Sequence, residues 1–186
     1  GDEPDGGVAG SAPRGDGRDG DAVGPADAGR AGACHLQRPG GGAVQGAARR
    51  HGAARVYAVD TAYGTLDWKL RNDPRVSVHE RTNFLHWTAS EPADLAVIDA
   101  GWTPLHLSAE AAVRSVKPAG VILGLLKPQY EAEKSELAGG VLASDRLADI
   151  VSRVRTRLGT RVVVKDEARS PYSGSGGNAE VWLLMV

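Results

Sequence analysis

The stretch that most constrains the fold is residues 121–126, Val-Ile-Leu-Gly-Leu-Leu, which carries no charge and is followed at once by Lys127 and Pro128. An apolar run of this length is typical of a strand buried on both faces of a parallel sheet. Lys127 then lies at the carboxyl end of a strand, where open α/β sheets collect ligands and chemistry. The simpler alternative is a lysine that closes a strand at the water boundary.

Three further apolar stretches of the chain end in an acid, at Asp60, Glu80 and Asp99. Segments with helical spacing or strand-like composition fill much of the rest: helices at 66–71, 105–116 and 145–158, and strands at 161–165 and 179–186. Alternation of strands and helices predicts an α/β fold with a mostly parallel sheet. The three carboxylates then face one crevice, where a nucleoside ligand would use one acid for its ribose hydroxyls and another polar group for its base. Each acid alone could be a solvated strand end.

The first fifty residues differ sharply in composition from the remainder. They hold more than half of the 25 glycines and no Lys, Ile, Met, Phe, Tyr or Trp. Their only large apolar residues are Val8, Val23, Leu36 and Val44. Such a segment buries too little surface to offset its ordering entropy. We therefore expect a low-complexity Gly/Ala-rich segment at 1–50 and a folded domain at 51–186.

Charge and cysteine content exclude several classes of protein. A net charge of −1 gives no broad basic field for nucleic acid, although a local patch or a separate domain could supply one. The single Cys34 excludes a disulfide framework, and no apolar run is long enough to cross a membrane. We expect a soluble cytoplasmic protein. Because the chain starts at Gly1 and its only methionine is Met185, we expect the natural amino terminus to lie upstream.

Four motifs occur in order along the folded part: 56–76 with its Val-Asp-Thr-Ala-Tyr-Gly core, Glu-Arg-Thr-Asn at 80–83, Lys-Pro-Gln-Tyr-Glu at 127–131 and Ser-Gly-Ser-Gly-Gly-Asn-Ala-Glu at the end of 170–180. Together they resemble the TlyA (haemolysin-A-like) ribosomal RNA 2′-O-methyltransferases, relatives of the FtsJ group. The resemblance covers about residues 52–186.

The resemblance implies a Rossmann-like class I methyltransferase, with an antiparallel last strand, that binds S-adenosylmethionine. It implies ribosomal RNA or ribosomal subunits as partners and no membrane. By motif, Asp60 would hold the cofactor ribose, and Glu80, Arg81 and Asn83 would lie beside the adenine. Asp99 would also contact the cofactor.

The resemblance also implies a Lys-Asp-Lys-Glu catalytic set and no metal. Asp99, Lys127 and Glu180 supply three of its four positions, whereas the first lysine has no candidate because no lysine precedes Lys69. These residue types suit the reaction. A ribose 2′-hydroxyl is a weak nucleophile that must be aligned with the methyl group and relieved of its proton.

The sequence also departs from the family pattern. Residues 99–104 read Asp-Ala-Gly-Trp-Thr-Pro where the family usually has Asp-Val-Ser-Phe, so Trp102 replaces the aromatic residue and the serine is lost. We expect the amino-terminal S4 RNA-binding module of the family to be absent from this chain. The first strand and its glycine-rich cofactor loop, due just before His51, are missing or scrambled, since no apolar strand precedes the glycines at 40–42.

Two hypotheses explain the altered amino-terminal segment. It is either coding sequence read out of frame, since a one-base shift permits the end of a first strand, a glycine loop and a helix over 38–48, or a genuine disordered extension rich in Gly, Ala, Asp and Arg. The nucleotide sequence decides between them. With the first strand missing, we expect little regular structure in residues 1–35, weak cofactor binding and no methylation.

Three other functions compete with the methyltransferase. One is an inactive Rossmann-like remnant that binds no cofactor. Another is a nicotinamide dehydrogenase, which needs a Gly-x-Gly-x-x-Gly loop after its first strand that the sequence lacks. The third is a membrane-active haemolysin, against which the lack of an amphipathic or spanning segment counts.

Overall fold

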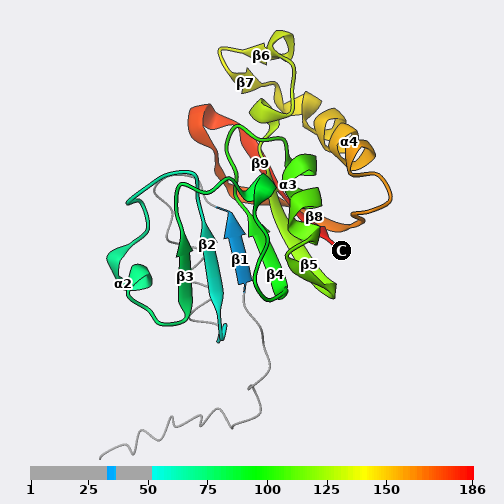
Figure 1. Ribbon diagram of the computed structural model, residues 1–186. Helices are drawn as coiled ribbons and strands as arrows, with labels where there is room; N and C mark the ends of the chain where they lie inside the picture. Colours follow the sequence, from blue (N-terminus) through cyan, green and yellow to red (C-terminus); the bar gives the residue numbers. More distant parts are fainter. Residues whose placement is uncertain (1–32, 37–51) are drawn as a thin grey trace, which may run out of the picture.

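The computed structural model describes residues 33–36 and 52–186, which form a seven-stranded sheet with helices against it (Figure 1). Across the sheet the strand order is β3-β2-β1-β4-β5-β9-β8. In chain order the strands of this sheet are β1 (Ala33–Leu36), β2 (Val56–Val59), β3 (Val76–His79), β4 (Ala93–Ile98), β5 (Val116–Leu126), β8 (Val164–Ser173) and β9 (Ala179–Met185).

The strand directions confirm the predicted architecture. β3, β2, β1, β4 and β5 are mutually parallel, so Asp60, Glu80, Asp99 and Lys127 all follow strands at one edge of the sheet. β9 runs antiparallel to both β5 and β8, as expected for the last strand. The fold is therefore the Rossmann-like arrangement with one reversed strand.

The expectation that the first strand is missing is wrong. β1 lies between β2 and β4, parallel to both, with Ala33 opposite Val56 and Leu95, and Leu36 opposite Val59 and Ile98. A strand in the centre of a sheet must offer backbone hydrogen-bond donors and acceptors to the strands on both sides. Four residues in extended conformation can do this even when they are not part of a long apolar run. The glycines at 40–42, expected as a weak cofactor loop, lie outside the described residues.

The helices pack on opposite faces of the sheet. α3 (Leu105–Val113) and α4 (Leu147–Leu158) cover the face that holds the larger core (Figure 1). The short helix α2 (Trp68–Arg71) contributes to a smaller core with Val56 and Ala58. Because neighbouring side chains of a strand point to opposite faces, and Tyr57 and Val59 belong to the larger core, the smaller core lies on the other face.

Several elements differ from the sequence prediction. β8 extends to Ser173, well beyond the expected 161–165, because this polar, exposed stretch pairs as an edge strand with β9 alone. β5 begins at Val116 rather than 121, with a register shift in its pairing to β4. The hairpin of β6 (Leu137–Ala138) and β7 (Val141–Leu142) was not predicted, and it lies beyond the carboxyl edge of the sheet (Figure 1).

Candidate active site

The buried Lys127 forms an ion pair with the partly exposed Asp99 at the carboxyl edge of the sheet. The lysine is 4% exposed, and its Nζ contacts Oδ1 of Asp99, which follows the neighbouring strand β4. Parallel pairing of β4 with β5 brings the two strand ends together, with Ile98 opposite Gly124. An amine buried in this way needs a partner for its charge, and Asp99 supplies it.

Glu180 lies at the start of β9, on the other side of β5. It is 6% exposed, and Leu126 is paired with Val181. Since β5 and β9 are antiparallel, extending that pairing by one residue places Glu180 across from Lys127. The structure thus gathers the three expected catalytic residues from three adjacent strands.

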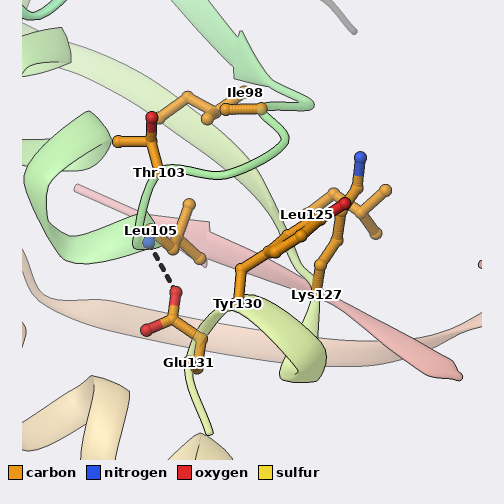
Figure 2. A pocket seen from close by; sticks show the side chains of 8 residues that line it. Ile98, Thr103, Leu105, Leu125, Lys127, Tyr130 and Glu131 are labelled. Carbon is orange, nitrogen blue, oxygen red and sulfur yellow. Dashed lines mark hydrogen bonds between the residues drawn. The ribbon is translucent and has the colours of Figure 1, made fainter. Parts of the chain in front are cut away.

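Lys127 also lines a small pocket together with residues of the loop that follows Asp99 (Figure 2). The pocket is lined by Ile98, Ala100, Thr103, Leu105, Leu125, Lys127, Tyr130 and Glu131. Two segments meet there: residues 99–104, here called the Asp99 loop, and residues 127–131, here called the Lys127 turn.

Glu131 joins these two segments. Its carboxylate accepts a hydrogen bond of 2.6 Å from the backbone N–H of Leu105, the first residue of α3 (Figure 2). Burial raises the pKa of Glu131 above its ordinary value, against the lowering effects of that hydrogen bond and of Arg157, whose guanidinium lies 3.7 Å away. The residue was not predicted as functional, because its partner is distant in sequence.

A second cavity of about 240 Å³ opens beside Asp60. It is lined by Val59, Asp60, Thr61, Thr82, Asn83, Phe84, Leu85, Ala100, Gly101, Trp102, Thr103 and Ser108. The Asp99 loop therefore borders both pockets. Sites for whole ligands usually measure about 300–1,000 Å³, so this cavity has room for part of a nucleoside cofactor.

Asp60 is 6% exposed at the end of β2. One carboxylate oxygen accepts a hydrogen bond of 2.8 Å from the N–H of Ala62, and the other is 3.4 Å from the Thr65 hydroxyl. Asn83 accepts a hydrogen bond of 2.9 Å from the N–H of Leu85 and caps the 3-10 helix Phe84–His86. These two expected cofactor residues both line the cavity.

Glu80 and Arg81, the first two residues of the 80–83 motif, do not line this cavity. Glu80 accepts hydrogen bonds from the Arg71 guanidinium at 2.5 Å and from the N–H of Gly64 at 2.8 Å, and the bond to Arg71 lowers the pKa of the Glu80 carboxyl. The guanidinium of Arg81 lies 4.3 Å from the centre of the Tyr63 ring. Both side chains brace the turn after β2.

Trp102 stands at the mouth of the site. It is 85% exposed, and its ring lies 5.3 Å from that of Tyr130, so the Asp99 loop and the Lys127 turn also meet through aromatic side chains. Its φ of +68° is in the left-handed region, which is rarely occupied by a bulky residue. Such backbone strain is typical of functional loops.

Asn178 connects the segment before Glu180 to the β6–β7 hairpin. Its side chain is buried and uses both ends of the amide: Oδ1 accepts from the N–H of Leu142 at 2.9 Å, and Nδ2 donates to the carbonyl of Gly140 at 3.0 Å. In the sequence, Asn178 stands out only as part of the motif at 170–180. Its partners lie 36 and 38 residues away, and no local pattern reveals them.

Over the residues that the structure describes, no group of three or more His, Cys, Asp or Glu side chains is placed to hold a metal ion. No helix in that part of the chain is long and apolar enough to span a membrane.

Comparison with protein families gives a match over residues 32–185 to the family described as FtsJ-like methyltransferase. The matched range includes β1.

Among characterised proteins, TlyA of Mycobacterium tuberculosis, named a 16S/23S rRNA (cytidine-2′-O)-methyltransferase, is 38% identical over 143 residues, which are 72% of this chain and 52% of TlyA. The candidate rRNA methyltransferase YqxC of Bacillus subtilis is 33% identical over 73% of this chain and 51% of its own length. The chain thus spans about half the length of these relatives.

Among solved structures, a candidate haemolysin from Streptococcus thermophilus superposes with a TM-score of 0.77 and 28% identity, covering 82% of this chain and 57% of that one. A fibrillarin from Aeropyrum pernix with bound S-adenosyl-L-methionine superposes with a TM-score of 0.57 at 14% identity over 84% of this chain and 66% of that one, which shows a shared fold.

Proposed function

Because the chain belongs to the FtsJ-like methyltransferase family, we propose that it transfers the methyl group of S-adenosylmethionine to a ribose 2′-hydroxyl of ribosomal RNA. The observation that carries the proposal is the ion pair of the buried Lys127 with Asp99, with Glu180 across from the lysine. The three residues come from separate motifs, and the fold gathers them at the edge where the Asp60 cavity also opens.

The cavity beside Asp60 fits part of the cofactor. The Asp60 carboxylate is suited to accept hydrogen bonds from ribose hydroxyls, as an acid at the end of a strand does in nucleotide-binding sheets. Phe84 and Leu85 give the same wall an apolar surface for the adenine, and Asn83 gives it an amide. When bound, S-adenosylmethionine supplies an electrophilic methyl group.

Lys127 has two tasks in this scheme. Its amine orients the ribose oxygen, and the burial that excludes water strengthens that contact. The new carbon–oxygen bond would form as the bond between the methyl carbon and the cofactor sulfur breaks, and the hydroxyl proton would pass to the set of Asp99, Lys127 and Glu180, in which the two carboxylates can accept it. The two carboxylates hold the lysine in place from either side of its strand.

The names of the relatives support RNA as the substrate class, and an exposed aromatic residue at the site is consistent with it. TlyA is named for methylation of 16S and 23S rRNA. The exposed ring of Trp102 at the mouth of the site offers a face on which an unpaired base can stack. We place the activity on ribosomal RNA or ribosomal subunits in the cytoplasm, with residues 51–186 and the strand β1 as the catalytic unit.

The experiment that tests this function measures transfer of labelled methyl groups to ribosomal RNA, with nuclease digestion and mass spectrometry to locate the 2′-O-methyl group. Lys127→Ala is expected to lower the rate by about 10²–10⁴-fold, the usual range for a group that moves a proton. Calorimetry should show S-adenosylmethionine affinity within about threefold of the wild type.

A matched control lies on the same two strands. Lys117, near the start of β5, pairs with Asp94 of β4 at 2.7 Å, at the opposite edge of the sheet. Lys117→Ala removes a lysine–aspartate pair between the same strands and should leave the transfer rate unchanged. Equal losses in both variants, or no methylation by the wild-type chain, would contradict the proposed function.

A further inference from the structure

Gly174 lies in the turn between β8 and β9, and the atoms around it leave no room for a side chain. Its φ of −71° is open to any L-amino acid, so backbone conformation does not select glycine there. A Cβ on Gly174 would lie 2.2 Å from Oε1 of Glu180, 2.8 Å from its Cδ and 3.2 Å from its Cγ. These separations are too short for non-bonded atoms, so a Cβ at position 174 and the Glu180 carboxylate would occupy the same space.

The turn is held firmly enough that it cannot simply withdraw. The N–H of Gly174 donates to the carbonyl of Asn178 at 2.8 Å, and the N–H of Gly177 donates to the carbonyl of Gly174 at 3.0 Å. Asn178 is 1% exposed and is tied to the β6–β7 hairpin by both ends of its amide. A side chain at position 174 would therefore displace the Glu180 carboxylate rather than the backbone.

Displacement of that carboxylate changes the site at its centre. Glu180 is buried and lies across from Lys127, whose other neighbour is Asp99. Moving the carboxylate alters both the charge around the lysine amine and the acceptor available to the ribose.

We propose that Gly174 is a positioning residue for Glu180: its missing side chain leaves the space in which the carboxylate is held beside Lys127. The inference rests on the proposed methyl transfer for its functional consequence and on the observed separations for its geometry. It also explains why a glycine stands here in an allowed conformation, whereas Gly176 and Gly177 of the same turn have positive φ.

The kinetic test compares the full chain with its Gly174→Ala variant. We expect kcat for methyl transfer to fall at least tenfold and the pH profile of kcat to shift, because a carboxylate has moved relative to Lys127. The S-adenosylmethionine Kd should stay within about threefold of the wild-type value.

Gly177→Ala is the control for a loosened turn. A Cβ at position 177 meets nothing within 4 Å, but the φ of +89° strains an alanine. It should lower Tm and keep the wild-type pH profile.

A second test needs no activity. Thermal unfolding is measured for wild type, Gly174→Ala, Glu180→Ala and the double variant. Gly174→Ala should lower Tm in the wild-type background and leave it unchanged once Glu180 is alanine, since the new methyl group then occupies vacated space. Equal Tm losses in both backgrounds, or an unaltered kcat and pH profile in Gly174→Ala, would overturn the inference. If the wild-type chain transfers no methyl group, the proposed function is wrong. The Tm values of the four proteins still test the role of Gly174 in that case.

Discussion

Glu131 is the residue through which the pH dependence of stability is most directly predicted. Burial raises the pKa of its carboxyl above the ordinary 4.5, so the folded state binds this proton more tightly than the unfolded state does. The stability that it contributes is fully present below the ordinary pKa and is lost as pH rises through the raised pKa. The ionised form of Glu131 is therefore less favourable in the folded protein than in the unfolded chain.

We expect Glu131→Gln to remove this fall in stability. Glutamine keeps an oxygen that can accept from the N–H of Leu105, but it carries no titrating group. Urea unfolding between pH 4 and pH 8 should give a free energy of unfolding that declines less with pH than in the wild type. Glu91→Gln, at an exposed ion pair with Arg55, serves as the control. A decline as steep in Glu131→Gln as in the wild type would refute the role of the buried carboxyl.

Single residues of the site differ in how far the sequence could predict them. Asp99, Lys127 and Glu180 stand at strand ends in recognisable motifs, so strand order alone brings them together. Glu131 contacts Leu105, which is distant in the chain, and Gly174 contacts Glu180 across a turn. Only the folded structure shows these two contacts. For Glu80, predicted as a cofactor residue from its motif, the structure adds hydrogen bonds from Arg71 and Gly64 to its carboxylate that the motif alone does not predict.

At the scale of elements, β9 allows a clean test of the two faces of the sheet. Leu183 and Leu184 are neighbours that point to opposite faces: the first is 0% exposed in the larger core and the second is 37% exposed. Leu183→Ala should cost about 2–5 kcal/mol of unfolding free energy, because it leaves a cavity in a packed core. Leu184→Ala should cost less than about 1 kcal/mol.

Denaturant unfolding of the two variants measures both free energies under the same conditions. Similar losses would mean that the face holding Leu184 is as tightly packed as the helix-covered face.

The sequence predicted best those strands and helices whose apolar residues are themselves buried in the core. β2, β4 and the last part of β5 are apolar because they are interior strands, and α4 places Ile150, Val151, Val154 and Leu158 against the core. β8 is an exposed edge strand of polar residues, and its pairing with β9 determines its length. β1 was missed for a related reason, because its position depends on backbone pairing with two neighbours.

For the whole molecule, the expectation of weak cofactor binding depended on an empty slot in the sheet, and β1 fills that slot. We therefore expect the full chain to bind S-adenosylmethionine and to be stabilised by it. A ligand that binds only the folded state at 100 times its Kd adds about 2.7 kcal/mol. For a chain of this size, that corresponds to a rise in Tm of about 5–10 °C.

The dependence of this stabilisation on Asp60 tests where the cofactor binds. Asp60→Ala removes the carboxylate that faces the 240 Å³ cavity, so the Tm rise at the same S-adenosylmethionine concentration should fall to less than half. Asp94→Ala, at the opposite edge of the sheet, should keep the full rise while losing only its pair with Lys117. Because removal of Asp60 also frees its hydrogen bonds to Ala62 and Thr65, each variant is compared with its own ligand-free Tm. An undiminished rise in Asp60→Ala would place the cofactor away from β2, whereas no rise in the wild type at millimolar cofactor would show that β1 alone does not complete the binding site.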